Sequence, residues 1–210
     1  MNTGDTARVL ASAALVLLMT PGLAFFYGGM TRAKGVLNMM MMSFGAIAVV
    51  GVLWILFGYS ATFGTDMVGG LLGNPLQKFG LEGVLDTGTS APLVGTIPEI
   101  AFVGFQATFA IIAVALVSGS IADRAKFGTW MVFVALWVTI VYFPVAHWVF
   151  DFGDKNGKGA GWLAHIGVLD FAGGTAVHVN AGAAGLALAR VLGKRGGWKK
   201  DPQRPHKLTL

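Results

Sequence analysis

Five long stretches without a formal charge dominate this 210-residue sequence. They run over residues 9–31, 35–65, 100–122, 127–150 and 171–189. A helix that crosses the hydrocarbon core of a bilayer needs about 20 apolar residues, so each stretch can contain one. Only 12% of the residues are charged, which is too few to cover five such helices in water. The sequence therefore predicts an all-α integral membrane protein with five transmembrane helices.

We expect these helices at about residues 8–30, 36–62, 98–121, 128–150 and 170–192, with a basic linker over 193–210. The first stretch follows Arg8 as a signal peptide would. It is long, however, and lacks an Ala-x-Ala cleavage pattern, so we expect a retained helix. The chain has no cysteine, which excludes disulfides, thiol catalysis and thiolate metal sites.

Lysine and arginine are distributed unequally between the two sides of the expected helices. Eleven of the 15 fall in the segments after the first, third and fifth helices, and four fall on the other side. Because cytoplasmic loops are enriched in positive charge, the sequence predicts an outside N-terminus and a cytoplasmic C-terminus. A nucleic-acid partner is not indicated, since the basic segment serves as a topology determinant beside anionic lipid.

The connecting segments differ in length between the two sides. Residues 32–34 and 123–126 form short cytoplasmic connections, which predict that helices one and two, and helices three and four, pack as tight antiparallel pairs. The outer connections are longer, and the second contains a polar turn at 154–158.

An acid and a histidine in the fifth stretch carry the main functional signal. Asp170 stands where the helix begins, and its carboxylate is expected to accept backbone N–H groups there. His178 follows eight residues later, about 12 Å deeper at the helical rise. An ionisable group at that depth marks a transport pathway by default. The alternative is a histidine that only packs between helices.

Aromatic residues gather near the expected outer ends of two helices. Phe105 and Phe109 are four residues apart and therefore share a helix face. Trp148 and Phe150 end the fourth stretch. Such a cluster can hold a small cation by cation–π attraction. Taken alone, however, it is more typical of the aromatic belt at a membrane interface.

Four segments together resemble the family of ammonium transporters, methylammonium permeases and Rhesus proteins. They are LAFFYGG at 23–29, FQATF at 105–109, PVAH at 144–147 and LDFAGGTAVHVN at 169–180. The resemblance covers the chain in order, and the bacterial ammonium transporters look most similar. It implies eleven helices, ten of them in two inverted repeats of five, in a homotrimer with one pore per subunit.

The resemblance also implies roles for individual residues. Ammonium or methylammonium would gather in an outer aromatic vestibule containing Phe105, pass a gate at Phe109, lose its proton and move as ammonia past His178. Asp170 would match the family's essential acid. The family's vestibule tryptophan corresponds in position to Phe150, with Trp148 as the other candidate. The protein would lie in the cell membrane, and relatives bind PII-type signal proteins on the cytoplasmic side.

The sequence ends just after the fifth expected helix, in the segment that leads to helix six in this family. We therefore expect only the first repeat of the fold, which by itself does not enclose a pore between two repeats. Three alternatives stay open: an ammonium sensor of the same family, a non-conducting degenerate half-transporter, and an unrelated membrane enzyme that uses His178 and Asp170. We expect no enzymatic activity, cofactor or metal, since the windows hold no Glu, Lys or Arg to act with His178 and the histidines are scattered.

Overall fold

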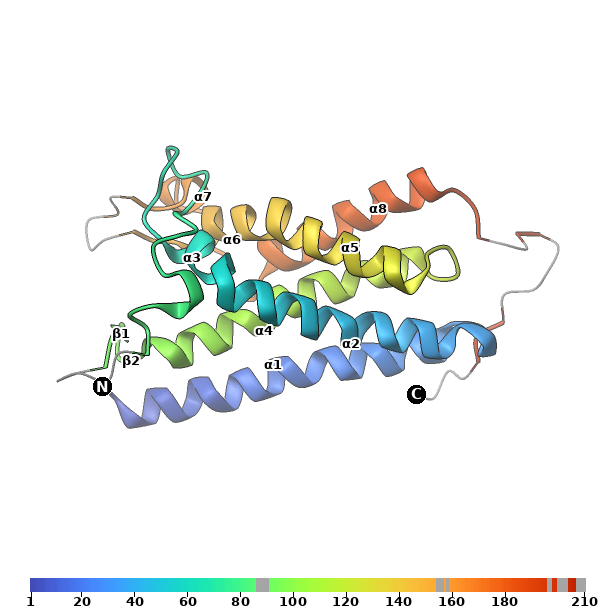
Figure 1. The fold of residues 1–210 in the computed structure, drawn as a ribbon, viewed down its shortest axis with the longest axis horizontal. Coiled ribbons are helices and arrows are strands. Elements are labelled where there is room, and N and C mark those ends of the chain that lie inside the picture. Colours follow the sequence, from blue (N-terminus) through green and yellow to red (C-terminus); the bar gives the residue numbers. More distant parts are fainter. Residues whose placement is uncertain (86–90, 154–156, 158, 196–197, 200–203, 207–210) are drawn as a thin grey trace.

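A computed structural model describes residues 1–85, 91–153, 157, 159–195, 198–199 and 204–206. Five membrane-length apolar helices run side by side along its long axis, with the long loops and the short helix α7 gathered at one end (Figure 1). They cover Thr3–Met30, Ala33–Phe63, Glu99–Ile121, Phe127–Phe150 and Gly174–Leu192. The prediction of five transmembrane helices is confirmed, and the chain is a multi-pass membrane protein. Parts of the predicted turn at 154–158 and of the linker at 193–210 lie outside the described residues.

The spans consist of several helical segments. The α-helices are α1 (Thr3–Met30), α2 (Val36–Leu53), α3 (Tyr59–Phe63), α4 (Glu99–Ser118), α5 (Phe127–Trp137), α6 (Phe143–Phe150), α7 (Trp162–His165) and α8 (Asn180–Leu192). Short 3-10 turns occupy Ala33–Gly35, Phe79–Leu81 and Gly119–Ile121. Strands β1 (Leu93–Val94) and β2 (Ile97–Pro98) pair antiparallel, with Val94 opposite Ile97.

Three spans contain a wider, π-helical turn. These turns lie at Trp54–Gly58, Val138–Tyr142 and Gly174–Val179, and each is followed directly by α-helix. The Tyr59 N–H bonds to the Trp54 carbonyl and the Phe143 N–H to the Val138 carbonyl, five residues back. π-turns of this kind are rare and occur frequently at functional sites.

The helix ends differ from the expected bounds in two places. The first helix begins at Thr3 because the Asn2 side chain accepts the Asp5 N–H at 3.1 Å and caps it five residues early. The last begins at Gly174, four residues later than expected, because Gly173 has a left-handed backbone with φ 76°. A left-handed residue interrupts the helical path, so Asp170 lies before the helix.

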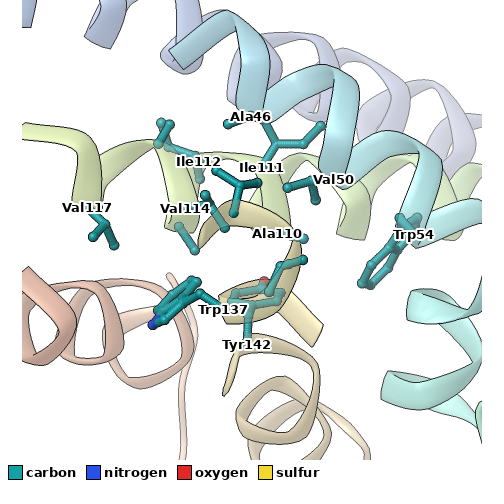
Figure 2. Close-up of a cluster of buried hydrophobic side chains, with 14 of the residues drawn as sticks. Ala46, Val50, Trp54, Ala110, Ile111, Ile112, Val114, Val117, Trp137 and Tyr142 are labelled. Carbon is teal, nitrogen blue, oxygen red and sulfur yellow. The ribbon is translucent and has the colours of Figure 1, made fainter. Parts of the chain in front are cut away.

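The α4 span lies at the centre of the packed structure. Over its most apolar stretch 56% of the residues are buried, against 11% for α1. Figure 2 shows its side chains Ile111 and Val114 beside Val50 of α2 and Trp137 of α5. Around them lies one continuous apolar core. Burying such surface between tightly packed helices holds the bundle together.

One predicted helix pair is wrong. Helices α1 and α2 do pack together, but α5 packs mainly along α2 and approaches α4 near Trp137, at its end. The reason is the small residue Gly45, which admits the Met131 and Phe127 side chains of α5. The Trp130 ring of α5 also donates to the Met42 carbonyl of α2 at 2.9 Å.

At the end opposite the long loops, two arginines connect the short turns. Arg32 Nε lies 3.1 Å from Asp123 Oδ2, which joins the turn after α1 to the turn after α4. Arg124 donates to the Gly193 carbonyl at 2.6 Å, just after α8 ends. A cation at a helix C-terminus is favourable, so Arg124 stabilises the end of α8.

The predicted orientation can be tested with single cysteines, because the chain has none of its own. Ala33 and Leu76 are both exposed, at opposite ends of the second span. In intact cells a membrane-impermeant maleimide should label Leu76→Cys, and should label Ala33→Cys only after lysis. The reverse pattern would show that the N-terminus is cytoplasmic.

Candidate functional site

The Asp170 carboxylate caps the N-terminus of the last span. It accepts the N–H groups of Gly174 at 2.7 Å, Thr175 at 2.8 Å and Ala176 at 3.1 Å. The turn at Gly173 brings the first free N–H groups of the helix to face the acid. The predicted capping role is confirmed. The arrangement fixes a negative charge at the positive end of the helix dipole.

His178 lies in the π-turn of the same span and opens to a groove. Its N–H bonds to the Gly173 carbonyl at 3.0 Å, five residues back. The groove has a volume of about 390 Å³ and lies between α8 and the C-terminal end of the α4 span. The other residues that line it are Leu116, Ser120, Ala181, Gly182 and Gly185. The histidine is exposed in this chain, so its own helices close only one side of the groove.

Phe105 and Phe109 form an aromatic pair on α4. Their ring centroids lie 5.0 Å apart with planes at 89°, an edge-to-face contact. Both side chains are half-buried. The prediction that they share one helix face is confirmed. Such a pair presents ring surface to a small cation or to an apolar neighbour equally well.

Phe150 and Trp148 lie in different surroundings. Phe150 lines a cavity of about 460 Å³ at the loop end, together with Phe102 and Gln106 of α4. The Trp148 ring instead packs against Trp162 of α7 at 5.9 Å and donates to the Leu71 carbonyl at 2.8 Å. The two candidates therefore do not form one aromatic wall.

The same cavity holds an ionic group that the sequence did not suggest. Glu99 is 5% exposed, accepts from the Tyr59 hydroxyl at 2.6 Å and pairs with Lys78. The Lys78 ammonium also lies 5.9 Å from the centre of the Tyr59 ring. The sequence did offer one signal, an acid at the start of a span. It could not identify the partners of Glu99, because they lie 21 and 40 residues away along the chain.

No group of three or more histidine, aspartate or glutamate side chains is placed to hold a metal ion among the residues that the structure describes. The candidate residues are instead distributed along the bundle. Phe150 and Trp148 lie at the loop end, Asp170 at the start of the last span, and His178 within that span. Aromatic side chains, a capping acid and an exposed histidine thus follow one another along the bundle.

Comparison with known proteins identifies the family of the chain. The Ammonium Transporter Family matches residues 7–210. An ammonium transporter of Mycobacterium tuberculosis is 58% identical over 99% of this chain and 46% of its own length. The crystal structure of Candida albicans Mep2 superposes with a TM-score of 0.83 at 35% identity, over 100% of this chain and 44% of that one.

A protein described as a sensor Amt protein is also similar, with a TM-score of 0.78 at 26% identity over 91% of this chain and 44% of its own. The chain thus spans about half the length of the relatives that it matches. It contains five membrane spans, and its matches correspond to the first of two repeats. The match over nearly its whole length shows that the chain belongs to the ammonium transporter family.

Proposed function

We propose that this chain supplies the first-repeat half of a pathway that moves ammonium, as ammonia, across a membrane. The observation that carries the proposal is His178 in an otherwise uncharged groove between α4 and α8, within a chain of this family. A neutral imidazole offers one donor and one acceptor to a small hydrogen-bonding solute. Methylammonium would follow the same route.

Recruitment of the cation is assigned to the loop end of the bundle. The cavity beside Phe150 carries aromatic surface and the Asp151 carboxylate, both of which attract a cation. Phe109 would act as the gate and Phe105 as part of the vestibule. Asp170 would stabilise the arriving charge while it stays bound to its three N–H groups.

Deprotonation is the step that makes the passage selective. Carrying a charge through an apolar lumen costs from roughly 3 to more than 10 kcal/mol. Ammonium can leave its proton behind and cross as neutral ammonia. Potassium has no proton to lose, so the same pathway excludes it.

The open side of the groove indicates how the pathway would be completed. His178 is exposed, and a polar side chain facing lipid is unfavourable. We propose that a second repeat covers this side, as inverted repeats do in other transporters. Alone, the chain would be a non-conducting half. A homotrimer and a PII-type partner are proposed from the family only.

The test joins this chain to the remaining half of the Mycobacterium tuberculosis relative. Expressed in cells that lack ammonium transporters, the fusion should take up labelled methylammonium, and the chain alone should not. His178→Leu in the fusion should reduce uptake at least about tenfold, because the donor and acceptor are lost. His165→Gln, at an exposed position of α7, is the matched control.

Uptake that is equal for His178→Leu and His165→Gln would contradict the proposal. The second candidate function is ammonium sensing, which the similarity to the sensor Amt protein favours. A sensor should bind ammonium at the same residues while the fusion, correctly inserted, shows no uptake.

A further inference from the structure

His147, near the end of α6, is a buried histidine that the proposed pathway does not use. Its side chain is fully buried, and its Nδ1 lies 2.8 Å from the Thr62 carbonyl oxygen. A carbonyl oxygen can only accept a hydrogen bond, so Nδ1 carries a proton and donates it. This contact settles which nitrogen is protonated in a neutral ring.

The other ring nitrogen faces an acid. Nε2 lies 3.5 Å from Asp66 Oδ1 and is buried without a hydrogen-bond partner. In a neutral ring it would turn a lone pair toward that carboxylate, and two acceptors repel each other. A second proton on Nε2 replaces the repulsion with a charge-assisted contact. A second acid, Asp151 Oδ2, lies 3.4 Å from Nδ1.

Other titratable side chains among the described residues border the two cavities beside the cluster. Lys78 borders the same cavity as Asp151, but it is paired with Glu99, to which Tyr59 also donates. Asp66 shares a second cavity, of about 420 Å³, with His165. These are the titratable groups around the cluster within the described residues.

The two acids respond differently to this environment. Burial raises the pKa of Asp151, and the nearby Asp66 charge raises it further. The Gly153 N–H and His147 act in the opposite direction but do not outweigh burial. Burial acts in the same direction on Asp66, but the N–H groups of Gly70 and Val68 and the His147 ring outweigh it and lower the pKa of Asp66. Asp66 is therefore the stronger acid of the two.

The cluster connects α6 to loop 64–74, which also contacts the ring of Trp148. Residues 64–74 include Asp66 and also the Leu71 carbonyl, which accepts from Trp148. The same loop accepts the Trp162 N–H at the Gly70 carbonyl, at 3.0 Å. Asp151 directly follows Phe150, and its backbone carbonyl accepts the Gly161 N–H at 2.8 Å. Loss of the cluster would release both sides of this region.

We propose that Asp66, His147 and Asp151 bind one proton between them, and that the resulting imidazolium is a positioning residue that locks loop 64–74 onto α6. The lock holds Trp148 and Phe150 in place at the loop end. Its stabilisation is present when the imidazolium is charged and is lost as the pH rises and the cluster releases its proton. At strongly acid pH it is lost again, when Asp66 becomes protonated.

Hydrogen exchange measured by mass spectrometry on the purified full chain tests the lock directly. Protection of 64–74, corrected for the intrinsic effect of pH, should fall about tenfold between about pH 6 and about pH 9. Asp66→Asn should make protection independent of pH over this range, because its amide can donate to a neutral Nε2. The hairpin β1–β2 serves as the internal reference, and His165→Gln should behave like the wild type.

The proposal is overturned if the protection of 64–74 in the wild type does not change with pH. It is also overturned if Asp66→Asn and His165→Gln give the same pH profile. The effect on transport rests on the proposed function: in the fusion, uptake should show a pH profile that Asp66→Asn flattens. If exchange depends on pH as stated and the fusion takes up nothing, the proposed function fails and the lock stands. If uptake occurs without the exchange effect, the lock fails alone.

Discussion

Asp170→Ala should destabilise the chain by roughly 2–4 kcal/mol. The substitution leaves three N–H groups at the start of the last span without their acceptor. Hydrogen bonds to an ionised group are stronger than neutral ones, and water replaces them only in part at a half-buried site. Thermal unfolding of the purified protein in detergent measures the loss.

Two matched variants separate the capping role from a general effect of charge. Asp170→Asn keeps one acceptor oxygen and should cost less than Asp170→Ala. Glu82→Ala removes a carboxylate at an exposed position and should change stability by less than about 0.5 kcal/mol. If all three unfold at the same temperature, Asp170 does not stabilise the helix. In the fusion, Asp170→Asn should still lower uptake, because the negative charge is gone.

Gly161→Ala should cost roughly 2–4 kcal/mol and disturb the loop end of the bundle. A Cβ at this position would overlap the His147 carbonyl oxygen and lie 2.6 Å from that of Trp148. Both obstacles are backbone atoms, so rotation of a side chain cannot relieve the overlap. The backbone of Gly161 has φ −55°, which any residue adopts, and the cost is therefore steric.

Gly128→Ala is the control for this substitution. Gly128 lies in the first turn of α5, and a Cβ there meets no atom within 4 Å. Alanine should be neutral or slightly stabilising, since glycine weakens a helix by up to about 1 kcal/mol. Equal unfolding temperatures for the two variants would mean that loop residues near 161 do not pack on α6 as described.

The number of spans could be predicted because hydrocarbon imposes a length and excludes charge. Which face of each span meets which neighbour could not, as the position of α5 on α2 demonstrates. A helix that is apolar all round has no polar stripe to indicate its exposed side. The choice depended on Gly45 receiving Met131, and a sequence reveals such a fit only after the helices are placed.

The contacts of the candidate site likewise divide into those that the sequence predicts and those that it does not. Residues within one helix, such as Phe105 with Phe109, follow from helical spacing alone. Contacts between a span and a distant loop could not be predicted from helical spacing. Trp148 reaches the Leu71 carbonyl across 77 residues, and His147 reaches Thr62 across 85. Trp148 and Phe150 looked interchangeable from sequence, yet only Phe150 lines the cavity with Gln106.

The π-helical turns have a consequence for how this protein can change over time. Each wide turn accommodates one residue more than an α-helix does, so the segment beyond it keeps a facing direction that ordinary coiling would not give. Loss of a single residue from α2, with the wide turn kept, would leave the span long enough for the bilayer, but it would rotate α3 by about 100°. Tyr59 would then turn away from Glu99. Insertions and deletions in these spans are therefore limited first by the direction that the downstream segment faces, and only then by the length of the span.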